Sequence, residues 1–273
     1  AKLALRSSIL RENGAYGAVL FGTVGTITAV DVKGTTGDLT QFQRGGAGLT
    51  AAGCSEVAAK SVRVLDNHDY GVLVERSAAT LGEEGVVDDV EIRGNAVGLW
   101  VNAAPGLPVT VTGALIDRNR GVGVGVAGDA EGGLPGEERS FVFCRSVVSG
   151  TERDMLPAFG ADPGAQPSEI GHGIAWLNAA LDAGSEEPAA PVEVTIDTVT
   201  LGANADESLL IDGAASGVLT GLVFEGSDAA KGIRQQNLGG MAPLSPPAGV
   251  MFSSADDRAV AIPVPQSAPP PES

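Results

Sequence analysis

Aromatic residues are scarce in this sequence, which has two Trp, two Tyr and seven Phe and is 4% aromatic over 273 residues. The core therefore has to come from Val, Leu, Ile and Ala, residues of similar volume that suit a narrow interior packed in layers. Glycine and proline are abundant instead, with 39 and 16 residues, and they predict many turns. This composition favours many short extended segments over a fold built around large rings.

Basic residues are also few, since 17 Lys and Arg stand against 34 Asp and Glu, a formal charge of −17. No basic cluster is present to neutralise phosphates, so we expect the protein to bind neither nucleic acid nor an anionic membrane surface. The apolar runs are much shorter than the roughly 20 residues that span a bilayer, so we expect no direct membrane insertion. Solubility explains the acidic surface, and binding of a cation or basic ligand is the alternative.

Only two cysteines occur, Cys54 and Cys144, without the CxxC spacing of zinc or redox sites. We expect two isolated, buried small residues, and a disulfide between them stays open. No signal peptide heads the chain, and Ala1 opens directly on repeat-like sequence. We therefore expect a mature form or a fragment of a longer protein with flanking domains.

One pattern recurs along the chain: an alternating apolar segment, an asparagine corner, and a second alternating segment that a glycine usually precedes. The clearest copy is VRVLDNHDYGVLV (62–74). Apolar residues two apart predict strands with one face inward. The corner residues are Asn13, Asn67, Asn95, Asn119 and Asn204, and the residues that open the second segment are Gly17, Gly71, Gly98, Gly121 and Ser208, with Gly48 opening a further copy.

Each copy takes roughly 25 residues, which matches a solenoid coil and is too short for a propeller blade. Segments rich in Gly, Pro and acidic residues interrupt the pattern and predict protruding loops at 128–139, 151–169 and 181–191. The segments 141–148 and 171–178 are expected to be the two halves of one coil. We assign 1–250 to one repeat domain, and 251–273 to a C-terminal segment with a Pro-rich tail or linker.

Stacked strand–Asn–strand coils with Val, Leu and Ile inward resemble the right-handed parallel β-helix of the pectin-lyase-like superfamily. The resemblance covers roughly residues 3–235. It implies an all-β solenoid of about seven or eight coils, with each strand pairing with its equivalent in the next coil at about 4.8 Å. It also implies that the corner asparagines stack as a structural ladder in which each amide bonds to the next.

Members of this superfamily that cleave acidic polysaccharides use clustered carboxylates, as general acid and base or as calcium ligands. Asp88, Asp89 and Asp117 lie in neighbouring coils and would form such a cluster here, with Ca²⁺ as its cation. Ordinary solvated side chains are the alternative. The motif GHG (171–173) is similar to that of polygalacturonases, but the aspartate pair of that family precedes GHG by about one coil, and here the two are several coils apart.

Outward aromatic side chains on a β-helix face are a common means of stacking sugars. Trp100 alternates outward, and we expect Trp176 to lie near the long insertion. Together with His172 they form a candidate ligand surface, with packing under loops as the alternative. His68 lies among aspartates in a corner, where a turn role competes with acid–base or metal chemistry. The sequence shows no nucleophile elbow and no second histidine in register with His68, so no catalytic residue and no metal site are assigned.

Two functions fit these observations. The first is a non-enzymatic, secreted or cell-surface β-helix module of a larger bacterial protein. It would act as a rigid scaffold, an adhesin, or a surface that binds polysaccharide or a cell-surface protein, without a cofactor. The second is a carbohydrate-active enzyme, a lyase, epimerase or hydrolase, that acts on an acidic polysaccharide near Asp88, Asp89 and Asp117.

Overall fold

The computed structural model describes residues 1–37, 46–128, 138–156, 168–177, 192–213, 216–225, 232–236, 244, 250–255 and 258–263. All regular structure in these segments is β, which confirms the all-β prediction. They contain no helix, and therefore none that could cross a membrane. Most of the loop predicted at 128–139, all of 181–191 and the Pro-rich residues after 263 lie outside the described segments.

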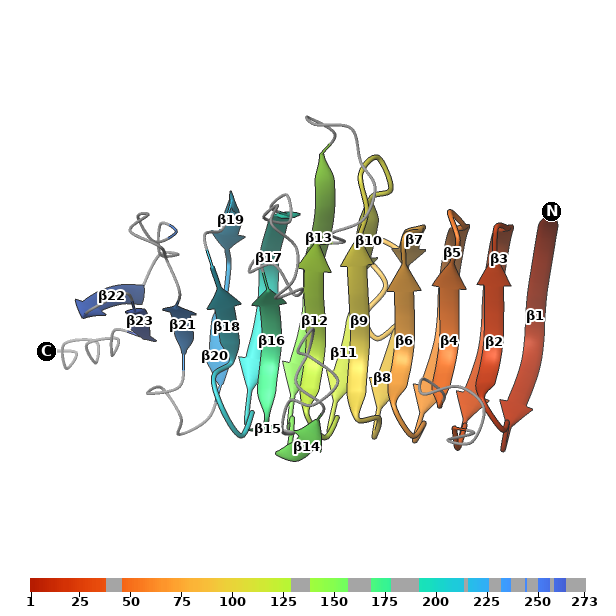
Figure 1. The fold of residues 1–273 in the computed structure, drawn as a ribbon, viewed down its shortest axis with the longest axis horizontal. Coiled ribbons are helices and arrows are strands. Elements are labelled where there is room, and N and C mark those ends of the chain that lie inside the picture. The colour runs from red at the N-terminus through yellow and green to blue at the C-terminus, as the bar shows by residue number, and fades with distance from the viewer. Residues whose placement is uncertain are drawn as a thin grey trace, which may run out of the picture.

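The strands form two large sheets, and the chain passes back and forth between them (Figure 1). Sheet A contains β1 (Lys2–Arg11), β3 (Val24–Lys33), β5 (Glu56–Leu65), β7 (Ala78–Leu81), β8 (Val90–Arg93), β10 (Val109–Thr112), β11 (Ala114–Asp117), β13 (Arg139–Ser149), β17 (Val192–Gly202), β19 (Ser216–Thr220) and β20 (Val223–Glu225). Sheet B contains β2 (Tyr16–Phe21), β4 (Ala47–Ala52), β6 (Tyr70–Glu75), β9 (Val97–Ala103), β12 (Val122–Gly128), β16 (His172–Leu177), β18 (Leu209–Asp212), β21 (Ile233–Gln236), β23 (Arg258–Pro263) and β22 (Val250–Ala255). The segment predicted as a loop at 151–169 contributes a separate antiparallel pair, β14 (Asp154–Leu156) and β15 (Ser168–Ile170).

Each passage of the chain adds one segment, of one or two strands, to sheet A and then one strand to sheet B. We call one sheet-A segment together with the sheet-B strand that follows it a repeat. Neighbouring repeats pair in parallel throughout both sheets. β13 and β16 belong to one repeat, as predicted for 141–148 and 171–178. After the last parallel strand of sheet B, β23 pairs antiparallel with β21 and β22 pairs with β23, so a hairpin closes that end of the sheet.

The register decides which glycine marks each repeat of sheet B. Leu99 pairs with Val124, so the equivalent of Gly98 is Gly123. The prediction of Gly121 for this place is wrong by two residues. A shift of two keeps a strand on the same face. Val124 accordingly points into the core.

The core lies between the two sheets and consists mainly of Val, Leu, Ile and Ala from the inward positions of each repeat. One repeat holds the large aromatic side chains of the core: Phe141 and Phe143 stack there with ring centroids 6.1 Å apart, and Trp176 of the same repeat is 0% exposed. Trp176 pairs with Val126, whose side chain is also in the core. The prediction that Trp176 belongs to a ligand surface is therefore wrong, because this side chain fills the interior.

A ladder of side-chain amides fastens the corner that follows sheet A. The backbone N–H and the Nδ2 of Asn67 both donate to Oδ1 of Asn95, at 2.9 and 3.0 Å. Asn95 donates in the same two ways to Oδ1 of Asn119, at 3.1 Å each. We call the residue that each repeat contributes to this ladder a rung. Two rungs are threonines, and their N–H groups donate to the asparagine of the next repeat. In chain order the rungs are Asn13, Thr35, Asn67, Asn95, Asn119, Thr151 and Asn204.

Hydroxyl groups join the repeats at the opposite corner, which follows sheet B. The N–H of Thr23 donates to Oγ of Ser55 at 3.2 Å, and the N–H of Ser55 donates to Oγ of Ser77 at 3.1 Å. Cys54 stands in this corner with a positive φ of 59° and is exposed. Cys144 is half-buried, and both thiols are free. The prediction that the two cysteines are buried is wrong for Cys54, whose side chain is exposed at this corner.

The asparagine ladder explains the recurring glycines. A Cβ at Gly98 would overlap the carbonyl oxygen of the next strand and lie 2.7 Å from Nδ2 of Asn119 and 2.9 Å from Cγ2 of Ile116. A Cβ at Gly71 would lie at the same 2.7 Å from Nδ2 of Asn95. Each of these glycines therefore gives room to the asparagine of the next repeat.

Gly98→Ala should lower the free energy of unfolding by about 2 to 3 kcal/mol, because the new methyl group overpacks the corner. Gly14→Ala is the matched control, since a Cβ at Gly14 would meet no atom within 4 Å. The control should change stability by less than about 0.5 kcal/mol. Urea unfolding of both variants measures the difference, and equal costs would contradict the role given to Gly98.

Asn95→Ala should cost about 3 kcal/mol, because it removes Oδ1 of Asn95, the acceptor of both the N–H and the Nδ2 of Asn67, and leaves these two donors buried without a partner. Asn13→Ala is the control, since the Asn13 side chain bonds no described residue and its Nδ2 is buried without a partner. The control should stay within about 0.5 kcal/mol of the unmodified chain. Equal effects in thermal unfolding would show that the ladder contributes nothing.

Candidate functional site

The three aspartates predicted as a carboxylate cluster do not come together. Asp88 and Asp89 precede β8, whereas Asp117 is the last residue of β11, which pairs with β8. The register places Asp117 beside Arg93, at the far end of β8. Asp89 and Asp117 are thus separated along the strands by four residues, or about 13 Å.

Two of these aspartates have structural partners. Oδ1 of Asp89 accepts hydrogen bonds from the N–H and Oγ of Ser61 at 2.9 and 3.0 Å, at the bend within β5. Asp117 lies 3.2 Å from Nε of Arg93 and accepts a hydrogen bond from Oγ of Ser149 at 2.9 Å. Both carboxylates therefore hold neighbouring repeats together, while Asp88 is exposed.

No metal-binding group of three or more His, Cys, Asp or Glu side chains occurs within the described segments. Nδ1 of His68 lies 2.7 Å from Oδ1 of Asp69, its neighbour in the chain. The carbonyl of His68 accepts a hydrogen bond from Arg120 at 2.8 Å. This arrangement ties the corner to another repeat, and it offers Ca²⁺ no set of oxygen ligands.

Trp100 faces away from the main core, as its alternation predicts, but it does not lie on an open surface. The residue is only 4% exposed, and its ring covers Gly125, where a Cβ would overlap it. Its Nε1 donates to Oδ1 of Asn102 at 2.8 Å. A tryptophan buried to this degree is no platform for a sugar ring. Its cluster on the outer face of sheet B includes Tyr70, Leu73, Ala96, Val97, Val122, Ala127, Ile170, Ala175 and Leu177.

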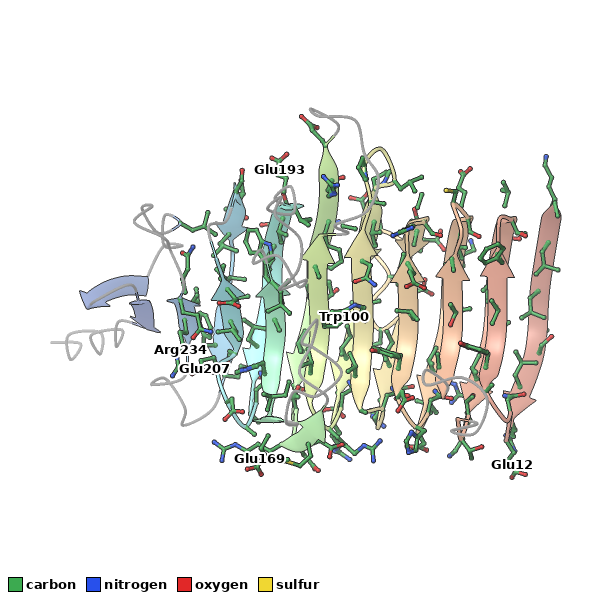
Figure 2. All side chains as sticks on the ribbon, in the orientation of Figure 1. Glu12, Trp100, Glu169, Glu193, Glu207 and Arg234 are labelled. Atoms are coloured by element: carbon green, nitrogen blue, oxygen red, sulfur yellow. The ribbon has the colours of Figure 1, made fainter. Side chains whose placement is uncertain are left out.

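His172 belongs to a group of charged side chains on the outer face of sheet B. Its Nδ1 lies 3.1 Å from Oε2 of Glu207. Arg234 pairs with the other oxygen of Glu207, and Figure 2 labels these two residues close to each other. The contact between His172 and Glu207 is close but is not aligned as a regular hydrogen bond. The side chains of His172 and Glu207 are only 12% and 14% exposed. His172 belongs to β16 and Arg234 to β21, and Glu207 lies two residues before β18, the strand between them. We call these three residues the triad.

Glu207 is held in its ionised form. Burial raises the pKa of Glu207, but the contact with His172, its own backbone amide and the charges of His172 and Arg234 outweigh burial and lower the pKa to about 2. A carboxyl group with so low a pKa carries no proton to donate near neutral pH. The triad therefore fits an ion-paired network better than a general acid.

Of this triad, only His172 is among the residues predicted from the sequence, and Glu207 and Arg234 are not. A signal for Glu207 was present, because it stands directly before Ser208 just as His172 stands directly before Gly173. Equivalent positions of neighbouring repeats lie side by side in a parallel sheet. The pairing of these two residues could therefore be predicted once the register was extended across the long insertion.

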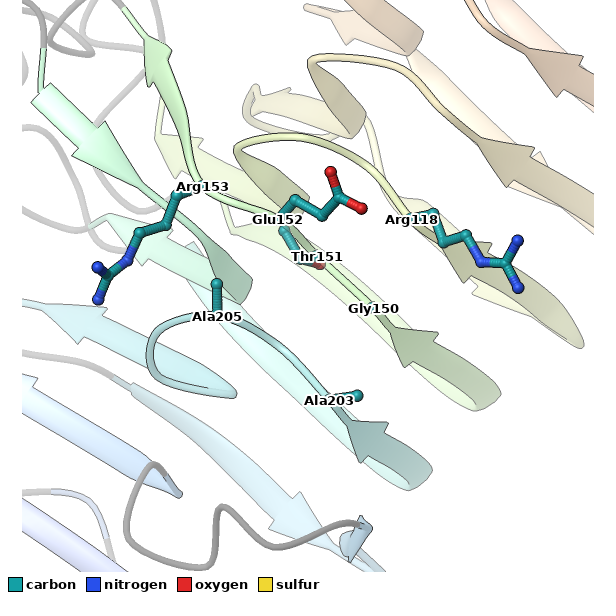
Figure 3. A pocket seen from close by; sticks show the side chains of 7 residues that line it. All are labelled: Arg118, Gly150, Thr151, Glu152, Arg153, Ala203 and Ala205. Carbon is teal, nitrogen blue, oxygen red and sulfur yellow. The ribbon is translucent and has the colours of Figure 1, made fainter.

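An open depression lies at the corner that follows β13 (Figure 3). Arg118 and Arg153 project from it in opposite directions, with Glu152 between them. Arg153 lies 2.7 Å from Oδ1 of Asp206, and Arg118 lies 3.4 Å from Asp117. Glycosidases need two carboxyl groups on either side of the scissile bond, and the lining of this depression supplies one. Its lining consists of Arg118, Gly150, Thr151, Glu152, Arg153, Ala203 and Ala205.

No protein-family model matches the chain, and no curated protein or solved structure matches it either. The resemblance to the pectin-lyase-like superfamily rests on the repeat pattern and on the two parallel sheets. Membership in that superfamily stays a prediction.

The low pKa of Glu207 predicts a specific acid sensitivity. Because the folded-state pKa of about 2 lies below the ordinary 4.5, ionised Glu207 stabilises the fold above pH 4.5, and this stabilisation is lost as the pH falls toward 2. The loss should be on the order of 2 to 3 kcal/mol. Glu207→Gln should lack this component of the pH dependence, whereas Glu152→Gln, at an exposed position, should keep it. Unfolding curves from pH 7 to 2 that coincide for the unmodified chain and Glu207→Gln would contradict the role of the triad.

Proposed function

We propose that the chain is a right-handed parallel β-helix that serves as a rigid, non-enzymatic scaffold or adhesin module of a secreted or cell-surface protein. The strand order supports the winding, because each passage of the chain adds one parallel segment of one or two strands to sheet A and one parallel strand to sheet B. The right hand follows from the general rule that about 98% of parallel crossover connections are right-handed.

The observation that carries this proposal is how the charged side chains are used. Arg63 pairs with Asp31 of the preceding repeat, and this contact lowers the pKa of Asp31. Arg93 pairs with Asp117, and Arg153 pairs with Asp206. Such surface pairs contribute little stability each. They do, however, pair acids with bases of neighbouring repeats, and of these side chains Arg153 alone lines the open depression. This arrangement suits a scaffold more than an active site.

The same surface favours a protein partner over a glycan. Trp100 and Trp176, the two tryptophans on which sugar stacking would depend, are both buried. Their burial leaves the predicted ligand surface of Trp100, His172 and Trp176 without an aromatic platform. We therefore propose that the module presents charged and polar repeats to another protein, with a polysaccharide-active enzyme as the competing hypothesis.

Assays on acidic polysaccharides separate the two hypotheses. We expect no cleavage or epimerisation of polygalacturonate or alginate, with or without Ca²⁺, and no retention on a glycan array. Turnover by the unmodified chain that is lost in Asp117→Asn or Glu152→Gln, while the Glu12→Gln control stays active, would replace the scaffold by an enzyme. Circular dichroism of each variant ensures that a loss of turnover is not a loss of the β-fold.

A further inference from the structure

The two ends of the molecule differ. At the C-terminal end of sheet B the hairpin of β22 and β23 covers β21. At the N-terminal end, β1 pairs with β3 and β2 pairs with β4, and neither has a second neighbour among the described strands (Figure 1). Over ten residues of β1 and six of β2, one side of each strand carries backbone N–H and C=O groups ready to pair with another strand. We call these two strands the β1–β2 edge.

Core positions are open to solvent at the β1–β2 edge. Leu5 and Leu10 stand in register with Ile27 and Val32, each of which is 1% exposed. Leu5 and Leu10 are only partly buried, because among the described strands only β3 pairs with β1. Monomeric proteins rarely leave a contiguous apolar group uncovered. The exposed apolar and aromatic side chains of the edge are Leu3, Ile9, Tyr16, Val19 and Phe21.

The first rung of the asparagine ladder also lacks a hydrogen-bond donor among the described residues at this edge. In every later asparagine rung that the structure describes, Oδ1 accepts the N–H of the preceding rung. Asn13 is the first rung, and no described residue donates to its Oδ1. Its Nδ2 is buried without a partner. A corner of another repeat would supply the missing donor, as the N–H of Thr35 does for Asn67 at 3.0 Å.

The charge of the β1–β2 edge indicates what kind of strand can pair with it. Lys2, Arg6 and Arg11 are exposed on β1, in a chain whose net charge is −17. Two copies that met edge to edge through an antiparallel β1 pair would bring these basic residues together, and like charges across strands are destabilising. A strand with carboxylates at the facing positions would form favourable cross-strand pairs instead.

We propose that the β1–β2 edge is a docking surface for one acidic β-repeat of the same strand–Asn–strand type. This repeat pairs in parallel with β1 and β2, covers Leu5 and Leu10 with its own inward residues, and donates a corner N–H to Asn13. Carboxylates on its first strand face Lys2 and Arg6. The proposal concerns the end of the molecule and goes beyond the scaffold role of its sides.

The test places a copy of residues 56–76 directly before Ala1. The register makes this junction continuous, because Lys2, Val24, Glu56 and Ala78 are equivalent positions. In the added copy Glu56 faces Lys2, and Lys60→Glu within the copy provides the carboxylate that faces Arg6. A control of equal length carries Val62→Ser and Val64→Ser in the copy, which removes its inward apolar residues.

Hydrogen exchange of residues 2–11, followed by mass spectrometry, is the readout. The acidic copy should slow exchange of these amides by about tenfold, and the serine control should leave it unchanged. Asn13→Ala, which is neutral in the unmodified chain, should weaken the protection that the acidic copy provides.

Equal exchange with the acidic copy and with the serine control overturns the proposal. It is also overturned if the unmodified chain sediments as a dimer whose β1 amides are already protected, because a second copy is then the occupant. Both outcomes leave the polysaccharide assays, and with them the scaffold proposal, unaffected.

Discussion

Hydrogen bonds from one corner to the asparagine of the next hold the repeats in register. Oδ1 of Asn95 accepts both the N–H and the Nδ2 of Asn67, and Asn95 in turn donates to Asn119. These groups are buried, so a slip of one residue would leave several of them unpaired, at a cost larger than the net gain from any single bond. Gly71 and Gly98 belong to the same interaction, because a side chain there would occupy the space of the amide.

Packing and surface charge both follow from this register. Alternation sends the apolar residues of every strand into one continuous core once the corners are aligned. On the outside, the same alignment brings Arg63 beside Asp31 and Glu207 beside His172. Charges that could have served a substrate are therefore paired between neighbouring repeats. The fold and the proposed scaffold role thus share one cause, the regular stacking of equivalent positions.

The repeat itself was predictable from sequence, because the asparagine, the glycine and the period of two are local signals. Burial of Trp176 was also within reach, since it stands three residues after Gly173, at the second inward position of its repeat. The threonine rungs, Thr35 and Thr151, were not, because a threonine in a turn has no distinctive spacing of its own. The separation of Asp117 from Asp89 was within reach too, because Asp89 stands six residues before its corner asparagine and Asp117 only two before its own.

Residue-resolved hydrogen exchange by NMR in Asn119→Ala tests most directly whether the ladder holds the corners. The N–H of Asn95 donates to Oδ1 of Asn119 at 3.1 Å, and the variant removes this acceptor. Our account predicts that the Asn95 amide exchanges at least about tenfold faster, while the amide of Leu99, within β9, keeps its protection. Unchanged exchange at Asn95 would contradict the account, because the corner would then be held without the asparagine.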